Sequence, residues 1–192
     1  MKKIALAALL AVSAFSAQAD TVELVINGNF ETGTFAGWTK SGNTSLSDVT
    51  RNTTTSNTTY LWRSGATGSA ASISQNLATS AGAKYNLSFD LFSAGTSSTN
   101  PSAVKFDAFF NGVQVFGFQN VTVPTWTHYS FDNLSATSAL TELKFSSRND
   151  PSFTRLDNIS VTAAPVPEPE TYAMMLAGLG LLGLIAKRRK AA

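Results

Sequence analysis

The most regular feature of the sequence is an alternation of apolar and polar residues with a period of two. In the segment AKYNLSFDLF, apolar side chains occupy every second position from Tyr85 to Leu91, and polar side chains fill the positions between them. This pattern predicts a β-strand with one buried and one solvent-facing side. The segment VKFDAFFNGVQVFGF repeats the pattern on both sides of Asn111-Gly112. We expect a hairpin there, because both residues of a tight hairpin turn need positive φ.

Further short strands are expected at six places, which are separated by clusters of Gly, Ser, Thr, Asn and Pro. They are TVELVI, TTYLWR, ASISQNL, THYSF, ELKFSS and RLDNISV. The polar segment 41–59 is expected to be a long loop or weak edge strands, and no convincing helix interrupts the strands. The expected fold class is all-β, an antiparallel β-sandwich in which a jelly roll is favoured over an immunoglobulin-like arrangement.

The N-terminal residues 1–19 have the pattern of a secretory signal peptide. Lys2 and Lys3 precede a short apolar run, and the small residues Ala17 and Ala19 offer a cleavage site. The run is shorter than the ~20 residues that a membrane helix needs. The mature chain is therefore expected to begin near Asp20, with a single sandwich domain over residues 20–163.

The tail, residues 164–192, contains a proline-rich spacer, an apolar stretch from Tyr172 to Ala186 and a basic cluster. The cluster consists of Lys187, Arg188, Arg189 and Lys190. Basic residues after an apolar stretch hold the C-terminus in the cytoplasm and leave the preceding domain outside. The stretch spans about 22 Å of a hydrocarbon core roughly 30 Å thick, so a transient transmembrane helix is expected rather than a permanent anchor.

Together with this stretch and cluster, the tripeptide Pro167-Glu168-Pro169 closely resembles the PEP-CTERM sorting tail of Gram-negative bacteria. The resemblance implies that an exosortase, a transpeptidase of the inner membrane, cuts near the tripeptide. The product then passes to the cell surface or the extracellular matrix. An ordinary tail anchor that follows a proline linker is the alternative.

The charge of the chain changes when both ends are set aside. The full sequence has a net charge of +2, but six basic residues lie in the signal peptide and the basic cluster. Residues 20–166 then carry eight Lys and Arg against ten Asp and Glu, which gives no basic surface for nucleic acid. Cysteine is absent, so disulfides and thiolate metal sites are excluded.

A second, looser resemblance covers most of the body. The segments NGNFETGTFAGW, SQNLATSAGAKYNLSFDL and TRLDNISV look like those of galactose-binding-like jelly rolls among secreted carbohydrate-binding modules. In such folds the opening turn and the closing strand lie together. The resemblance implies that Glu31 and Asp157 share a site.

Asp157 raises a question of charge, because it is in phase with Ile159 and Val161 and so points toward the core on a regular strand. An unpaired charge there is too costly. One possible partner is Ca²⁺, which takes six to eight oxygen ligands that Glu31, Asp157 and turn carbonyls would supply. The alternative is a salt bridge to Arg155 or hydrogen bonds from turn amides.

Candidate sugar contacts lie in TTYLWR. If Leu61 points inward, Tyr60 and Trp62 form an exposed platform beside Arg63 on which a sugar ring would stack. In the alternative, Tyr60 and Trp62 are themselves the inward pair.

We expect no enzyme activity. His128 is the only histidine, and it is expected on the outer face of a strand, away from any Ser-His-Asp arrangement. Glu31, Glu142, Asp107 and Asp150 are the acids formally available for glycoside hydrolysis, but none lies in a motif. The functional prediction is a surface or matrix protein that associates with exopolysaccharide in a biofilm. A purely structural or adhesive role and, third, a glycan-active enzyme are the alternatives.

Overall fold

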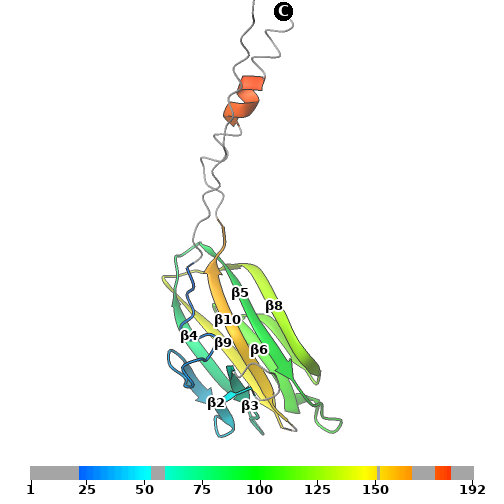
Figure 1. Ribbon diagram of the computed structural model, residues 1–192. Coiled ribbons are helices and arrows are strands. Elements are labelled where there is room, and N and C mark those ends of the chain that lie inside the picture. The colour runs from blue at the N-terminus through cyan, green and yellow to red at the C-terminus, as the bar shows by residue number, and fades with distance from the viewer. Residues whose placement is uncertain (1–21, 53–58, 151, 166–175, 183–192) are drawn as a thin grey trace, which may run out of the picture.

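The computed structural model describes residues 22–52, 59–150, 152–165 and 176–182. Strands dominate them and form two five-stranded antiparallel sheets (Figure 1), as the alternation predicts. The expected signal peptide, the tripeptide Pro167-Glu168-Pro169 and the basic cluster lie outside the described residues. Residues 176–182 are helical and exposed. Within the part of the chain that is described, no helix is both long enough and apolar enough to span a membrane.

The first sheet, here called sheet A, has the strand order β2-β3-β10-β5-β8. Its strands are β2 (Ser47–Arg51), β3 (Tyr60–Ser64), β10 (Thr154–Ala163), β5 (Lys84–Ser93) and β8 (Val123–Ser135). The second sheet, sheet B, has the order β1-β4-β9-β6-β7. Its strands are β1 (Thr39–Gly42), β4 (Ala71–Ala78), β9 (Leu140–Asn149), β6 (Val104–Phe110) and β7 (Val113–Gln119). The polar segment 41–59 thus contains the end of edge strand β1 and the whole of edge strand β2, and its residues 53–58 lie outside the described residues.

The core lies between the two sheets and is rich in aromatic rings. Phe89 of β5 meets Phe145 of β9 edge to face, with ring centroids 5.3 Å apart, and Phe106 of β6 also packs against Phe89. All members of the buried cluster lie between Val25 and Val161. Within the described residues the two sheets and the N-terminal segment thus supply nearly the whole of this cluster, and we expect a fragment of residues 20–165 to fold on its own.

The hairpin predicted at Asn111-Gly112 is confirmed. It joins β6 to β7, and its two turn residues have φ values of 54° and 73°. In contrast, the described part of TVELVI, residues 22–26, does not form a strand. Its contacts include an isolated bridge from Glu23 to Thr162 and a hydrogen bond from Leu24 N to Val161 O.

The N-terminal turn, residues 27–33, extends sheet A where β3 stops pairing with β10. The N–H of Ile159 donates to the Gly28 carbonyl at 3.0 Å, and a Cβ on Gly28 would lie only 1.9 Å from the Ile159 oxygen. Only glycine permits this approach of two backbones. The turn carries Glu31, whose Oε1 accepts from the Tyr60 N–H at 2.8 Å.

β10 contains an irregularity between Asp157 and Ser160, where Asn158 has a φ of 50°. This bulge breaks the regular alternation on which the phase argument for Asp157 relied, although Asp157 is buried, as that argument expected. Leu156 and Ile159 both belong to the core although they are three positions apart. The extra residue of the bulge shifts the alternation by one position, so that the strand faces inward again at Ile159. Asp157 instead pairs in register with Asp90 of β5.

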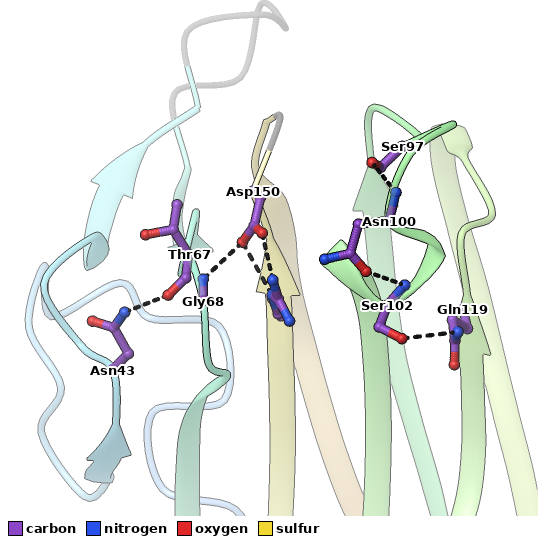
Figure 2. A network of polar contacts seen from close by, with 9 residues as sticks. Asn43, Thr67, Gly68, Ser97, Asn100, Ser102, Gln119 and Asp150 are labelled. Carbon is purple, nitrogen blue, oxygen red and sulfur yellow. Dashed lines mark hydrogen bonds and ion pairs between the residues drawn. The ribbon is translucent and has the colours of Figure 1, made fainter.

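Polar contacts tie the loops together at one end of the sandwich (Figure 2). The Asn43 amide donates to the Thr67 carbonyl at 2.7 Å, and Asp150 Oδ1 accepts from the Gly68 N–H at 3.1 Å. A second group links the backbone N–H groups and side chains of four residues, namely Ser97, Asn100, Ser102 and Gln119. These bonds fix the loops around the ends of β6 and β9.

Candidate functional site

Trp62 does not form the exposed platform that was one of the two alternatives for TTYLWR. Its side chain is 1% exposed and belongs to the core, and its indole N–H donates to Ser47 Oγ at 2.8 Å. Tyr60 is half-buried and packs against the same core. The inward alternative therefore holds for this pair, and Trp62 is excluded as a sugar contact. Leu61 is also buried, although it is not a member of the core cluster.

Arg63, the third residue of the predicted platform, does reach the surface. Its guanidinium bonds the carboxylate of Asp48 twice, from Nε at 3.0 Å and from a terminal nitrogen at 2.6 Å. The same guanidinium lies 4.8 Å from the ring centre of Phe153. A paired bond of this kind holds an arginine in one orientation.

Arg63 belongs to a row of side chains that crosses sheet A, here called the aromatic-arginine row. In register, Asp48 of β2 faces Arg63 of β3, Arg63 faces Arg155 of β10, and Arg155 faces Phe92 of β5. These positions alternate with buried ones on their strands, so the row lies on the outer face.

The row ends on β8 with Trp126, whose ring centre is 6.0 Å from that of Phe92. The Arg155 guanidinium lies 4.8 Å from the centre of the Phe92 ring. All three side chains are half-buried. No signal in the sequence indicates this grouping, because the five strands that carry it are scattered between residues 47 and 163. Within each strand, only the period-two alternation indicates an outward position.

Glu31 lies close enough to Asp157 for its charge to act on it, and so does a third carboxylate, that of Asp90. Asp157 is 6% exposed, and its Oδ1 accepts from the Asn158 N–H at 2.8 Å. Burial, together with the negative charges of Glu31 and Asp90, raises the pKa of Asp157 to about 7. We call Glu31, Asp90 and Asp157 the acid cluster.

No cation from the protein balances Asp157 among the described residues. Of the two alternatives to calcium, the salt bridge from Arg155 is not formed, whereas a hydrogen bond from a backbone amide, that of Asn158, is. Asp90, the third member of the acid cluster, has both carboxylate oxygens engaged, Oδ1 by His128 Nδ1 and Oδ2 by the Asn158 amide, each at 2.7 Å. The described residues accordingly contain no set of three His, Cys, Asp or Glu side chains arranged to hold a metal. Any ion would therefore rely on Glu31, Asp157 and backbone carbonyls.

His128 is on the outer face of β8, as expected, with its side chain 63% exposed. Two acids that were formally available for hydrolysis have cationic partners. Hydrogen bonds from Arg148 and from the Gly68 N–H lower the pKa of Asp150, and Asp107 lies 3.1 Å from the Lys105 ammonium. For Asp150 these bonds favour the ionised form, which does not donate a proton.

Comparisons with known proteins bear on the tail and on the sandwich separately. Residues 165–190 match the model of the PEP-CTERM protein-sorting motif. No curated protein matches the chain. The motif implies export, transient membrane anchoring and sorting to the surface by an exosortase.

Solved structures resemble the sandwich. The carbohydrate-binding module TmCBM61, in complex with β-1,4-galactotriose, has a TM-score of 0.58 at 17% identity over 74% of this chain and 99% of its own. The CBM22-1 xylan-binding domain of Xyn10C from Paenibacillus barcinonensis has a TM-score of 0.53 at 16% identity over 77% and 97%. A cyclase from Fischerella sp. TAU also reaches 0.53 at 16% identity over 77% and 100%.

Identities this low establish the fold and leave the activity open, since the same fold occurs in a binding module and in a cyclase. The chain thus combines a jelly-roll β-sandwich of the kind found in carbohydrate-binding modules with a PEP-CTERM sorting motif at residues 165–190.

Proposed function

We propose that this chain is an exported, non-enzymatic protein of a Gram-negative bacterium whose sandwich binds extracellular polysaccharide. In this proposal an exosortase removes the tail near Pro167 and releases the sandwich to the cell surface or matrix. There it associates with the exopolysaccharide of a biofilm. The sorting motif supports the destination, and the likeness to carbohydrate-binding modules supports the type of partner.

The observation that carries the binding function is the aromatic-arginine row. Sugar rings present C–H faces that stack on flat side chains, and their hydroxyls bond charged groups at the edge of the stack. Phe92 and Trp126 supply two neighbouring rings, and Arg63 and Arg155 supply donors in the same row. A row that crosses a whole sheet suits an extended chain of sugars better than a single small molecule.

We also propose that Ca²⁺ binds at the acid cluster as a structural ion. The buried, unbalanced carboxylate of Asp157 supports this assignment. So does the N-terminal turn, which carries a second carboxylate, Glu31, close enough for its charge to act on Asp157. Oxygen atoms of this type are the ligands that calcium prefers. The ion would neutralise Asp157 and pin the turn to β10.

Binding is tested with residues 20–165 and a panel of polysaccharides, by affinity electrophoresis. We expect retention on at least one polymer, and we expect Trp126→Ala to weaken it about tenfold, as for loss of one stacked ring. The matched control is Phe109→Ala, which removes a half-buried ring from the outer side of sheet B. No retention on any polymer would favour the structural or adhesive alternative. Release of reducing ends would instead favour the enzyme.

Calcium binding is tested by titration calorimetry on the same unit after treatment with a chelator. We expect one site, which is lost in Glu31→Gln and in Asp157→Asn and retained in Glu142→Gln, where the acid is exposed on β9. Equal calcium binding by all three variants would contradict the assignment.

A further inference from the structure

Arg155 occupies an electrostatically unfavourable position in the aromatic-arginine row. Its register partner on β3 is Arg63, and like charges directly opposite each other destabilise a sheet. Arg63 is compensated by its paired bonds to Asp48. Among the residues that the structure describes, no carboxylate forms an ion pair with Arg155.

The surroundings of Arg155 make its unpaired positive charge more costly. The side chain is half-buried, and burial together with the positive charge of Arg63 lowers its pKa. The guanidinium is held over the Phe92 ring at 4.8 Å, and Trp126 lies beyond that ring. Its hydrogen-bond donors are thus fixed next to an aromatic surface without an acceptor from the described protein.

We propose that Arg155 binds a carboxylate group of an acidic, uronate-containing polysaccharide, while Phe92 and Trp126 support the sugar that carries this group. The inference rests on the proposed polysaccharide-binding function and names the class of its ligand. Asp48 and Arg63 show the expected geometry on the neighbouring strands, namely two parallel bonds between a guanidinium and a carboxylate. At Arg155 the ligand supplies the carboxylate.

Charge complementarity at the row, and not the overall charge, would drive this recognition. Residues 20–166 contain more acidic than basic side chains, so the sandwich as a whole does not attract a polyanion. An acidic polysaccharide would therefore be retained only if it reached the local positive charge of Arg155, which no carboxylate of the described residues compensates. A neutral polysaccharide would leave the Arg155 charge half-buried and unpaired.

The experiment compares two forms of one polymer, polygalacturonate and its fully methyl-esterified derivative, because they differ only at the carboxyl group, which is charged in the first and a neutral methyl ester in the second. Alginate and hyaluronate are added as further acidic polymers, and galactan and xylan as neutral ones. Binding by residues 20–165 is measured by affinity electrophoresis at fixed salt. We expect at least one acidic polymer to bind, with polygalacturonate favoured about tenfold or more over its ester.

The variants are Arg155→Gln and Arg155→Lys, with Arg51→Gln as the matched control. Arg51 also lies on sheet A, over the ring of Tyr60 at 5.2 Å, but outside the row. We expect Arg155→Gln to bind acidic and neutral polymers equally weakly, and Arg155→Lys to keep the charge preference with reduced affinity. Arg51→Gln should resemble the natural chain, and urea unfolding verifies that each variant is folded.

The possible outcomes separate the inference from the function on which it rests. Equal binding of both forms of polygalacturonate, binding of neutral polymers only, or an unchanged preference in Arg155→Gln would overturn the inference and leave polysaccharide binding standing. No binding to any polymer of the panel would overturn both.

Discussion

The raised pKa of Asp157 leads to an unusual dependence of stability on pH. In the folded chain this pKa is about 7, against an ordinary value of 3.8. Between these two values the folded state holds a proton that the unfolded state has lost. The free energy of unfolding therefore decreases as the pH rises through this window. The contribution of neutral Asp157 is fully present below pH 4 and is lost by about pH 7.

The magnitude follows from the size of the shift. A pKa difference of about three units corresponds to roughly 4 kcal/mol, at 1.36 kcal/mol per unit. Because the carboxylate keeps some contact with solvent and with the Asn158 N–H, we expect about half of this, roughly 2 kcal/mol. In Asp157→Asn the dependence between pH 4 and pH 7 should disappear.

The assay is urea unfolding of residues 20–165 at several pH values in the presence of a chelator, followed by tryptophan fluorescence. The comparison is made in a His128→Gln background, because histidine is the other side chain that ordinarily titrates between pH 5 and 8. The reasoning would be refuted if stability rose between pH 5 and pH 7, or if Asp157→Asn kept the pH dependence of its parent. Added calcium should restore stability at pH 8 and have little effect at pH 5, since the ion competes with the proton.

Three further expectations concern the sandwich and the tail. Gly28→Ala should lower the free energy of unfolding by about 2 kcal/mol or more in urea, because its Cβ would meet the Ile159 carbonyl at 1.9 Å. Gly68→Ala, where nothing lies within 4 Å, should lose only about 1 kcal/mol to its positive φ. Ser147→Ala should leave the free energy of unfolding unchanged or raise it by up to about 1 kcal/mol, because the buried hydroxyl has no hydrogen-bond partner. Thr154→Val should lower the free energy of unfolding, because it removes a hydrogen bond to Ser93 Oγ. Mass spectrometry of the exported product should show a new C-terminus near Pro167, and a mature chain that still contains Leu181 would contradict the sorting model.

The strands and the hairpin could be predicted from the sequence because their signals are local. In β5 every second residue from Tyr85 to Leu91 is buried, and the turn at Asn111-Gly112 needs only its own two residues. β3 was ambiguous for a physical reason. Leu61 and Trp62 are adjacent, both apolar and both buried, so alternation alone does not decide which of them faces the core.

Asp157 shows how one inserted residue defeats a phase argument. The alternation assumed a regular strand through Ile159, but Asn158 takes a positive φ and shifts the phase. The Asp-Asn pair was an available signal, since asparagine tolerates this conformation better than most residues. The meeting of Glu31 with Asp157 could be anticipated only through resemblance, since more than a hundred residues separate them in the chain.

The bulge in β10 also explains why the two proposed ligand sites are neighbours. Before the bulge, β10 pairs with β3, and Arg155 faces outward. Beyond the bulge, β10 instead forms backbone contacts with the N-terminal segment that leads to Glu31. Arg155 and Asp157 are therefore only about 7 Å apart along the strand, which is less than one Debye length at physiological salt. Without a cation, the acid cluster would repel any polyanion that approached Arg155. A calcium ion at the cluster would reverse that repulsion, so the proposed cation and the proposed acidic polysaccharide would each favour the binding of the other.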